Sequence, residues 1–271
     1  MTGAELSATA GALDAIHPRY GFDLTAEGPE WHPYPTLPER LGEWSTELIA
    51  AGRAPAEVAM SLLSGVMGPV VRPVALAWVL RGELLAVDAG TVAVRRRGRV
   101  VDRAALRCEV RRTVDPAPLA ALLAELLAPV VDALHTHTRF GRRTLWGGLA
   151  DHLASHTLWA GRHAAEPPAA LQTRFAQVQA VLDGVADRVS VRFPRPRPYP
   201  VRETLSHVRG TCCLHYRIPG RAHGDGTPSR GSTPPAPAPR YCSTCPLLDE
   251  DTRREKLATF VEATTRTAHR G

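Results

Sequence analysis

The chain has 271 residues, of which 44% are hydrophobic and 22% are charged, so it is long and apolar enough to bury a sizeable core. Its formal net charge of +6 is uneven, because residues 190–271 hold 13 arginines and one lysine against seven acids, while residues 1–189 are close to neutral. The N-terminus lacks the basic start and apolar run of a signal peptide, and we expect a cytoplasmic protein with no transmembrane segment.

The first predicted elements are helices within residues 36–80. Apolar residues recur near helical spacing at the start of this stretch, namely Leu37, Leu41, Trp44, Leu48 and Ile49. Residues 84–102 (LLAVDAGTVAVRRRGRVVD) then change to the valine-rich pattern of strands, with an arginine-rich turn around Gly98. We therefore predict a β-hairpin near residues 84–102.

The clearest helix of the chain follows Asp115 and Pro116, which are typical of an N-cap and a first helical turn. Its apolar face is marked by Leu119, Leu122, Leu123, Leu126, Leu127, Val130, Val131 and Leu134. Two more helices are predicted over residues 143–163 and 169–187. The sequence SVRF at 190–193 favours a strand.

The last part of the chain is irregular in composition. The sequence PRPRPYP (194–200) predicts a rigid, extended connector. Residues 219–239 are rich in Pro, Gly and Ser without apolar periodicity, which predicts a disordered surface loop, and a tail helix is expected over about 249–264. We thus expect an α+β fold, mostly helical with a small antiparallel sheet, divided into a mainly helical substrate-side domain (1–189) and a C-terminal cysteine-bearing segment (190–271).

Four of the five cysteines lie in this C-terminal segment, as an adjacent pair and a pair spaced by two residues: Cys212, Cys213, Cys242 and Cys245. In a reducing compartment such a cluster more often binds a metal or performs redox chemistry than forms structural disulfides. The fifth cysteine, Cys108, lies far upstream, and we expect it to be a buried small apolar residue.

Three chemistries compete for the four cysteines. A zinc site takes four thiolates, but it usually draws them from two Cys-x-x-Cys turns, and only Cys242 and Cys245 have that spacing. A dithiol redox centre at those two residues would leave Cys212 and Cys213 unexplained. A 2Fe–2S cluster spreads four thiolates over two irons and tolerates unusual spacings better. The spacing alone leaves zinc and the iron–sulfur cluster open.

The segments CCLHYRIPG (212–220) and YCSTCPL (241–247) together resemble the FhuF-type ferric-siderophore reductases. The resemblance covers about 40 residues, and TLWGGLADHLA (144–154) is a weaker match to the helical region of that family. The family usually has about ten residues between the two cysteine pairs, and here there are 28. Lengthening a flexible loop by this much costs only ~0.9 kcal/mol, which four metal–thiolate bonds easily offset.

This resemblance implies that Cys212, Cys213, Cys242 and Cys245 hold a 2Fe–2S cluster. It also implies a one-electron reduction of a ferric siderophore, of the hydroxamate type, that releases Fe(II) in the cytoplasm or at the inner face of the membrane. The electron donor would be a ferredoxin or a flavoprotein, and no nucleic-acid partner is expected. The alternative is a zinc-stabilised module that binds nucleic acid or protein without redox activity. A cluster-bearing sensor without turnover is a third interpretation.

Several other residues near the cysteines or in the helical region could contribute. Arg209 and Arg217 flank the first cysteine pair and could stabilise the reduced cluster, or could simply be solvated. His207 and His215 are interpreted as hydrogen-bonding or surface residues, because four cysteines already complete the site. His152 and His156, at i and i+4 with no third ligand evident, are interpreted as core or surface residues rather than as metal ligands. Trp146 and Trp159 could line a siderophore cleft, but both are interpreted as core residues.

Overall fold

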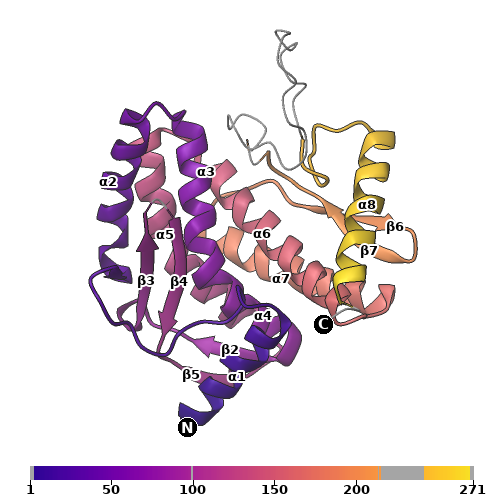
Figure 1. Ribbon diagram of the computed structural model, residues 1–271, viewed down its shortest axis with the longest axis horizontal. Coiled ribbons are helices and arrows are strands. Elements are labelled where there is room, and N and C mark those ends of the chain that lie inside the picture. Colours follow the sequence, from indigo (N-terminus) through magenta and orange to yellow (C-terminus); the bar gives the residue numbers. More distant parts are fainter. Residues whose placement is uncertain (1–2, 99, 213, 215–240, 269–271) are drawn as a thin grey trace, which may run out of the picture.

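The computed structural model describes residues 3–98, 100–212, 214 and 241–268 (Figure 1). It is 61% helical with small antiparallel sheets of two and three strands, which confirms the predicted α+β class with a helical majority. The N-terminal helices are α1 (Gly3–Ile16), α2 (Leu37–Ala50), α3 (Pro55–Val66) and α4 (Arg72–Arg81). The helices predicted within 36–80 are thus present, interrupted by a turn in which Gly52 adopts a φ of 86°.

Helices α3 and α4 are joined without a loop by a π-helical stretch, Met67–Val71. Two prolines lie in this region, Pro69 and Pro73, and neither can donate a backbone hydrogen bond. Widening of the helix by a π-turn accommodates such missing donors. The combined run Pro55–Arg81 and the later helix Pro116–Thr138 are apolar and long enough to cross a membrane, but 83% and 56% of their most apolar windows are buried inside the fold. A helix buried in the core of a protein can be as long and as apolar as a membrane-spanning helix, so length and composition are weak evidence for a membrane span.

The predicted hairpin is present, but it begins later than expected. Strands β3 (Val92–Arg97) and β4 (Val100–Leu106) pair around Gly98, and β1 (Trp31–Pro33) adds a third strand beside β3. Residues at the start of the predicted region instead form β2 (Glu83–Ala86), which pairs with β5 (Glu109–Arg112). A pattern of alternating valines predicts that a segment forms a strand, but it does not specify which other strand that segment pairs with.

Three long helices follow: α5 (Pro116–Thr138), α6 (Arg142–His163) and α7 (Pro168–Val189). Asp115 caps α5 by accepting the Ala117 backbone N–H at 2.9 Å, as the sequence predicts. All eight apolar residues predicted for the α5 face are buried, and the helix continues through Pro129. In Figure 1, α6 and α7 run between the N-terminal elements and the C-terminal hairpin.

The strand predicted at 190–193 is wrong. Residues 191–196 have no sheet partner, and the buried Phe193 instead stacks on Trp146 of α6 with ring centroids 6.3 Å apart. The strand lies further along the chain: β6 (Arg197–Val201) includes the second half of the predicted connector and pairs with β7 (Thr204–Val208). A short apolar alternation does not determine strand pairing, and here the side chain of Phe193 is buried against α6 instead.

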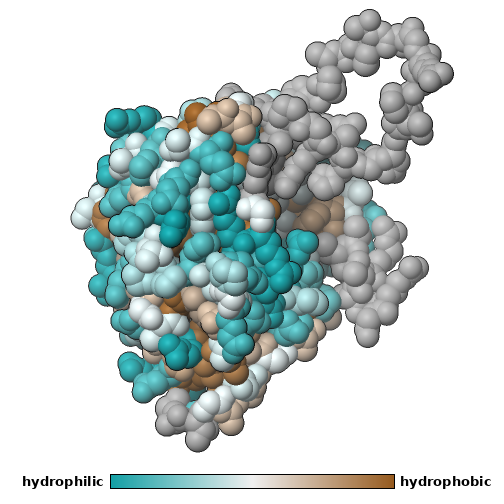
Figure 2. All heavy atoms as spheres, turned by 60° about the vertical axis from the view of Figure 1, so that its left-hand side comes forward, coloured by the Kyte–Doolittle hydropathy of each residue, from teal (hydrophilic) through white to brown (hydrophobic). Residues whose placement is uncertain are grey.

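The C-terminal elements pack on the helices through two small apolar groups. Leu205 of β7 lies with four residues of α6 and α7, namely Ala154, Leu158, Leu171 and Phe175. The tail helix α8 (Glu250–Ala268) packs Leu257 and Val261 against Val201 of β6. The loop predicted at 219–239 lies outside the described residues. Figure 2 shows that polar residues cover most of the face it displays, with apolar residues in small groups between them.

Candidate metal centre

The first cysteine segment leaves the end of β7 and is held by one buried carboxylate of α6, Asp151. Its Oδ1 accepts the backbone N–H of Gly210 at 2.7 Å, and its Oδ2 accepts the backbone N–H of Thr211 at 3.0 Å. The Thr211 hydroxyl donates to the same Oδ2, and Arg209 Nε donates to it at 3.2 Å. Asp151 therefore fixes the three residues that immediately precede Cys212.

The Asp151 carboxylate is only 1% exposed, and its protonation reflects two opposed effects. Burial raises the pKa of Asp151, while the positive Arg209 and the hydrogen bonds from Thr211 and Gly210 oppose that rise. The cost of removing this carboxylate from water is offset because its two oxygens accept several hydrogen bonds.

Glycines allow the backbone of the first segment to approach the rest of the fold closely. A Cβ on Gly147 of α6 would lie 2.2 Å from Thr211 Cγ2. A Cβ on Gly210 would lie 2.7–2.8 Å from the backbone of Arg195. Neither position can accept a larger residue without moving residues next to Cys212.

The second cysteine segment is a tight turn followed by α8. The Cys245 N–H donates to the Cys242 carbonyl at 3.0 Å, and the Leu248 N–H donates to the Cys245 carbonyl at 3.4 Å. Lys256 Nζ of α8 donates to the Tyr241 carbonyl at 3.0 Å. The turn is thus closed by its own backbone and attached to the helix that follows.

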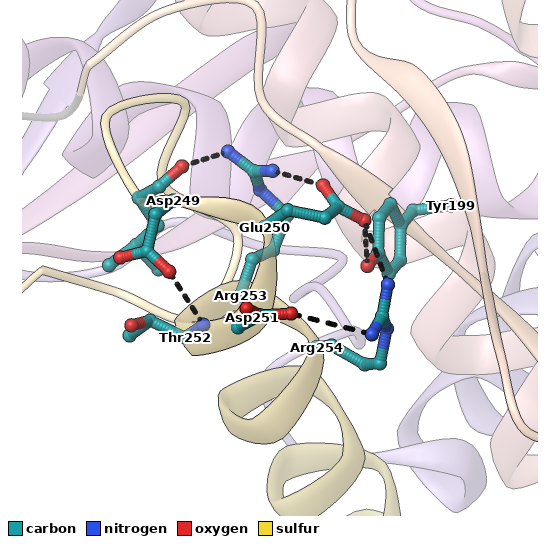
Figure 3. A network of polar contacts seen from close by, with 8 residues as sticks. Tyr199, Asp249, Glu250, Asp251, Thr252, Arg253 and Arg254 are labelled. Atoms are coloured by element: carbon teal, nitrogen blue, oxygen red, sulfur yellow. Dashed lines mark hydrogen bonds and ion pairs between the residues drawn. The ribbon is translucent and has the colours of Figure 1, made fainter.

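A polar network fastens the start of α8 to the hairpin (Figure 3). Asp249 caps the helix by accepting the Thr252 N–H at 2.9 Å, and this bond lowers the pKa of Asp249. The Tyr199 hydroxyl of β6 donates to Glu250 at 2.6 Å, and Glu250 also accepts from the buried Arg253 at 2.8 Å. These contacts fix the position of the turn that carries Cys242 and Cys245.

The two cysteine segments meet through the backbone. The Arg209 N–H donates to the Thr244 carbonyl at 3.0 Å, so a residue three positions before Cys212 is bonded to the turn between Cys242 and Cys245. Arg209 belongs to the first cysteine segment, its guanidinium binds Asp151 of α6, and its backbone N–H binds the second turn. It therefore links three parts of the site. Arg209 thus lies close to both cysteine segments, as its position before the first cysteine pair suggests.

Of the predicted cysteine ligands, three are described. Cys245 is 2% exposed, Cys212 and Cys242 are half-buried, and none of the three is in a disulfide among the described residues. Cys213 lies outside the described residues, as do His215 and Arg217. In the part of the chain that the structure describes, no group of three or more Cys, His, Asp or Glu is placed to hold a metal ion.

The chemistry of the donor set fits a thiolate-bound metal. The ligand candidates are cysteines on two segments that are bonded to each other, and the Asp151 carboxylate is occupied by its four donors. Soft thiolates favour zinc or iron–sulfur clusters over hard cations. Cys108, by contrast, lies between β4 and β5 and is half-buried against the core, where burial raises the pKa of its thiol to about 11.

The other residues singled out in the sequence are buried or half-buried. Trp146 is buried, as expected. His207 is 3% exposed, and burial lowers its pKa to about 3. His152 and His156 are half-buried neighbours with ring centroids 4.4 Å apart, and Trp159 is half-buried against the main core.

Sequence reasoning missed Asp151, Gly147 and Thr211. The available signal was a lone acid and a Gly-Gly pair on the otherwise apolar stretch TLWGGLADHLA. An acid among buried apolar positions must have partners, although the sequence does not say which. No family model matches the chain, and no curated protein matches it closely enough to assign a family.

Proposed function

We propose that this protein is a ferric-siderophore reductase whose 2Fe–2S cluster is held by Cys212, Cys213, Cys242 and Cys245. The observation that carries the proposal is the hydrogen bond from the Arg209 N–H to the Thr244 carbonyl, which joins the two cysteine segments. The resemblance of those segments to the reductase family supplies the identity of the cluster. When bound, a 2Fe–2S cluster would supply one electron at a time, which suits the conversion of chelated Fe(III) to weakly held Fe(II).

The residues of the chain have positioning roles in this proposal. Asp151 and Arg209 hold the first segment, and the Tyr199–Glu250–Arg253 network holds the second. The half-buried Cys212 and Cys242 mark the side from which a chelate or an electron donor would approach, while Cys245 faces the interior. A ferredoxin or a flavoprotein would reduce the cluster again after each turnover. The reaction would take place in the cytoplasm or at the inner face of the membrane.

The test is anaerobic purification followed by assays of iron, sulfide and zinc on one sample. We expect a reddish-brown protein with about two irons and two sulfides per chain, which dithionite bleaches. The reduced protein should transfer its electron to ferrioxamine, with Fe(II) trapped by a ferrous chelator. Cys242→Ser should abolish the visible spectrum, and Cys108→Ser is the matched control that should retain it.

A colourless protein that holds one zinc after anaerobic reconstitution would contradict the proposal and favour the zinc-stabilised module. A coloured protein that reduces no ferric chelate would leave the cluster but reject the reductase.

A further inference from the structure

One face of α6 carries a row of imidazole and indole side chains that the proposed cluster site does not use. His152, His156, Trp159 and His163 are spaced by four, three and four residues, so they lie along one side of the helix. Together with His17 and Tyr20, which face them from the turn after α1, and Arg72 at the start of α4, they are called the α6 row here. Asp151, which holds the first cysteine segment, directly precedes this row on the same helix.

The side chains of the α6 row contact one another closely. Trp159 stacks on His163 with ring centroids 5.0 Å apart and meets His17 edge-on at 5.5 Å. The Tyr20 hydroxyl lies 3.3 Å from His156 Nδ1, and the Arg72 guanidinium lies 5.4 Å from the Tyr20 ring. Tyr20 is buried, whereas His17, Arg72, Trp159 and His163 are each half-buried and form the accessible edge of the row.

The row is surrounded by positive charge with little negative charge to balance it. Arg72, Arg162 and Arg209 all act electrostatically on its members or on the neighbouring His207. Among the groups that the structure describes, Asp14 acts on His17, while Asp151 is engaged by Arg209 and by the backbone of Gly210 and Thr211.

Four histidines in and beside the row have pKa values shifted in the same direction. Burial first, and then the neighbouring positive charges, lower the pKa of His17, His152, His156 and His207. The imidazoles are therefore neutral near pH 7 and can still donate hydrogen bonds, while the arginines keep their charge.

Four buried nitrogens in and next to the row lack a hydrogen-bond partner within the described part of the chain. They are Arg72 Nε, Arg162 Nε, His152 Nε2 and His207 Nε2. Buried polar groups in folded proteins are almost always paired, and arginine nitrogens can only donate, so the exceptions at Arg72 and Arg162 indicate a missing acceptor. Arginine charge combined with unpaired nitrogens is the environment that an anion stabilises.

We propose that the α6 row is a binding site for an anionic, oxygen-rich ligand with flat aromatic groups. Trp159 and His163 stack on each other and are both half-buried, so they can offer a ligand only the outer sides of this stacked pair, while Arg72 offers charge-assisted hydrogen bonds to oxygen. Resting on the proposed function, the preferred ligand is a ferric chelate of net negative charge, such as a tris-catecholate, which departs from the hydroxamate type that the resemblance implies; a cationic hydroxamate complex such as ferrioxamine would be the weaker ligand. Trp159 lies only about 12 Å along the α6 axis from Asp151, so this ligand would bind near the cysteine segments.

The test uses gallium(III) chelates, which match ferric complexes in charge and shape but are not reduced. Calorimetric titration of the oxidised full-length protein compares a trianionic gallium tris-catecholate with the monocationic gallium complex of desferrioxamine B. We expect the trianion to bind at least about tenfold more tightly, with a difference that shrinks as salt is raised. Equal affinities for the two complexes would overturn the proposal.

Variants then locate the site. Arg72→Gln should weaken binding of the trianion about tenfold, because it removes a charge-assisted hydrogen bond, and Arg72→Lys should recover most of that loss. Arg143→Gln is the matched control: it removes one exposed charge from the first turn of α6, about 30 Å along the helix axis from His163, and should leave binding unchanged. A thermal melt of each variant checks that it is folded. If Arg72→Gln does not fold, His163→Gln is used in its place, and it too should weaken binding of the trianion.

The outcomes separate this proposal from the proposed function. A zinc protein without a cluster that still prefers the trianion would contradict the reductase and support the anion site. A cluster-bearing protein in which Arg143→Gln weakens binding as much as Arg72→Gln would overturn the anion site and leave the reductase standing.

Discussion

Asp151 is a carboxylate on a helix face that is otherwise apolar, and its four hydrogen bonds all go to the three residues before Cys212. Such a group is costly to bury alone and stabilising only while its partners remain in place. At the scale of single residues, Asp151 therefore positions the backbone of the first cysteine segment.

Substitution of Asp151 tests this role. Asp151→Ala leaves the buried backbone N–H groups of Gly210 and Thr211 without their acceptor, and we expect it to lower the free energy of unfolding by about 3–5 kcal/mol. Asp151→Asn should cost about half as much, because one amide oxygen can still accept. Urea unfolding measures the cost, and hydrogen exchange of residues 209–212 in metal-free protein should become faster in both variants.

The matched control is Asp132→Asn, which alters an exposed ion pair with Arg142 at the surface of α5. Exposed pairs contribute little, so its cost should stay below about 1 kcal/mol. If Asp151→Ala costs no more than this control, Asp151 does not hold the segment.

At the scale of elements, α6 connects the two parts of the fold, because it packs against α3, α4 and α5 and also against α7, β7 and α8. Its glycines lie where neighbours approach most closely: a Cβ on Gly148 would lie 3.1 Å from Leu63 of α3, and a Cβ on Gly161 would lie 2.5 Å from Leu171 of α7. Gly147 plays the same part toward Thr211. Glycine lowers the intrinsic stability of a helix, and at these three contacts the absence of a side chain permits the close packing that offsets this cost.

Gly147→Ala should therefore destabilise the protein, although alanine is the better helix former. The new methyl group would meet Thr211 Cγ2 at 2.2 Å, and Thr211 cannot rotate away without breaking its hydroxyl bond to Asp151. We expect a loss of about 1–3 kcal/mol in the free energy of unfolding and, if the proposed cluster is bound, a lower yield of it on reconstitution.

The comparison for this prediction is Gly11→Ala in α1, where a Cβ meets nothing within 4 Å. That variant should be neutral or more stable by up to about 1 kcal/mol. Equal unfolding midpoints for the two variants would show that Thr211 is not held against α6.

At the scale of the whole molecule, the C-terminal segment depends on the helices that it covers. Its hairpin buries Leu205 among residues of α6 and α7, Arg162 of α6 donates to the Leu205 carbonyl at 2.8 Å, and its cysteine-bearing end is bonded to Asp151. The apolar group of its own, around Val201, Leu257 and Val261, is small. A two-stranded hairpin and one helix with so little buried surface are not expected to fold alone.

We therefore expect residues 190–271, expressed alone, to give the circular dichroism of a largely unfolded chain and a poorly dispersed NMR spectrum. The full-length protein under the same conditions is the control. A dispersed spectrum from the isolated segment would show that it is an independent domain, in agreement with the boundary expected at residue 189.

The sequence by itself determined the helices and the clustering of cysteines, because both are local. The eight buried residues of the α5 face and the Asp115 cap follow from spacing along one helix, and the two cysteine pairs are visible as short motifs. Tertiary structure alone decided which strand pairs with β2, where β6 begins, and that Asp151 binds residues about 60 positions later. These are contacts between distant segments, and the free energy that selects them comes from burial and hydrogen bonding in the assembled fold, of which local sequence patterns carry no record.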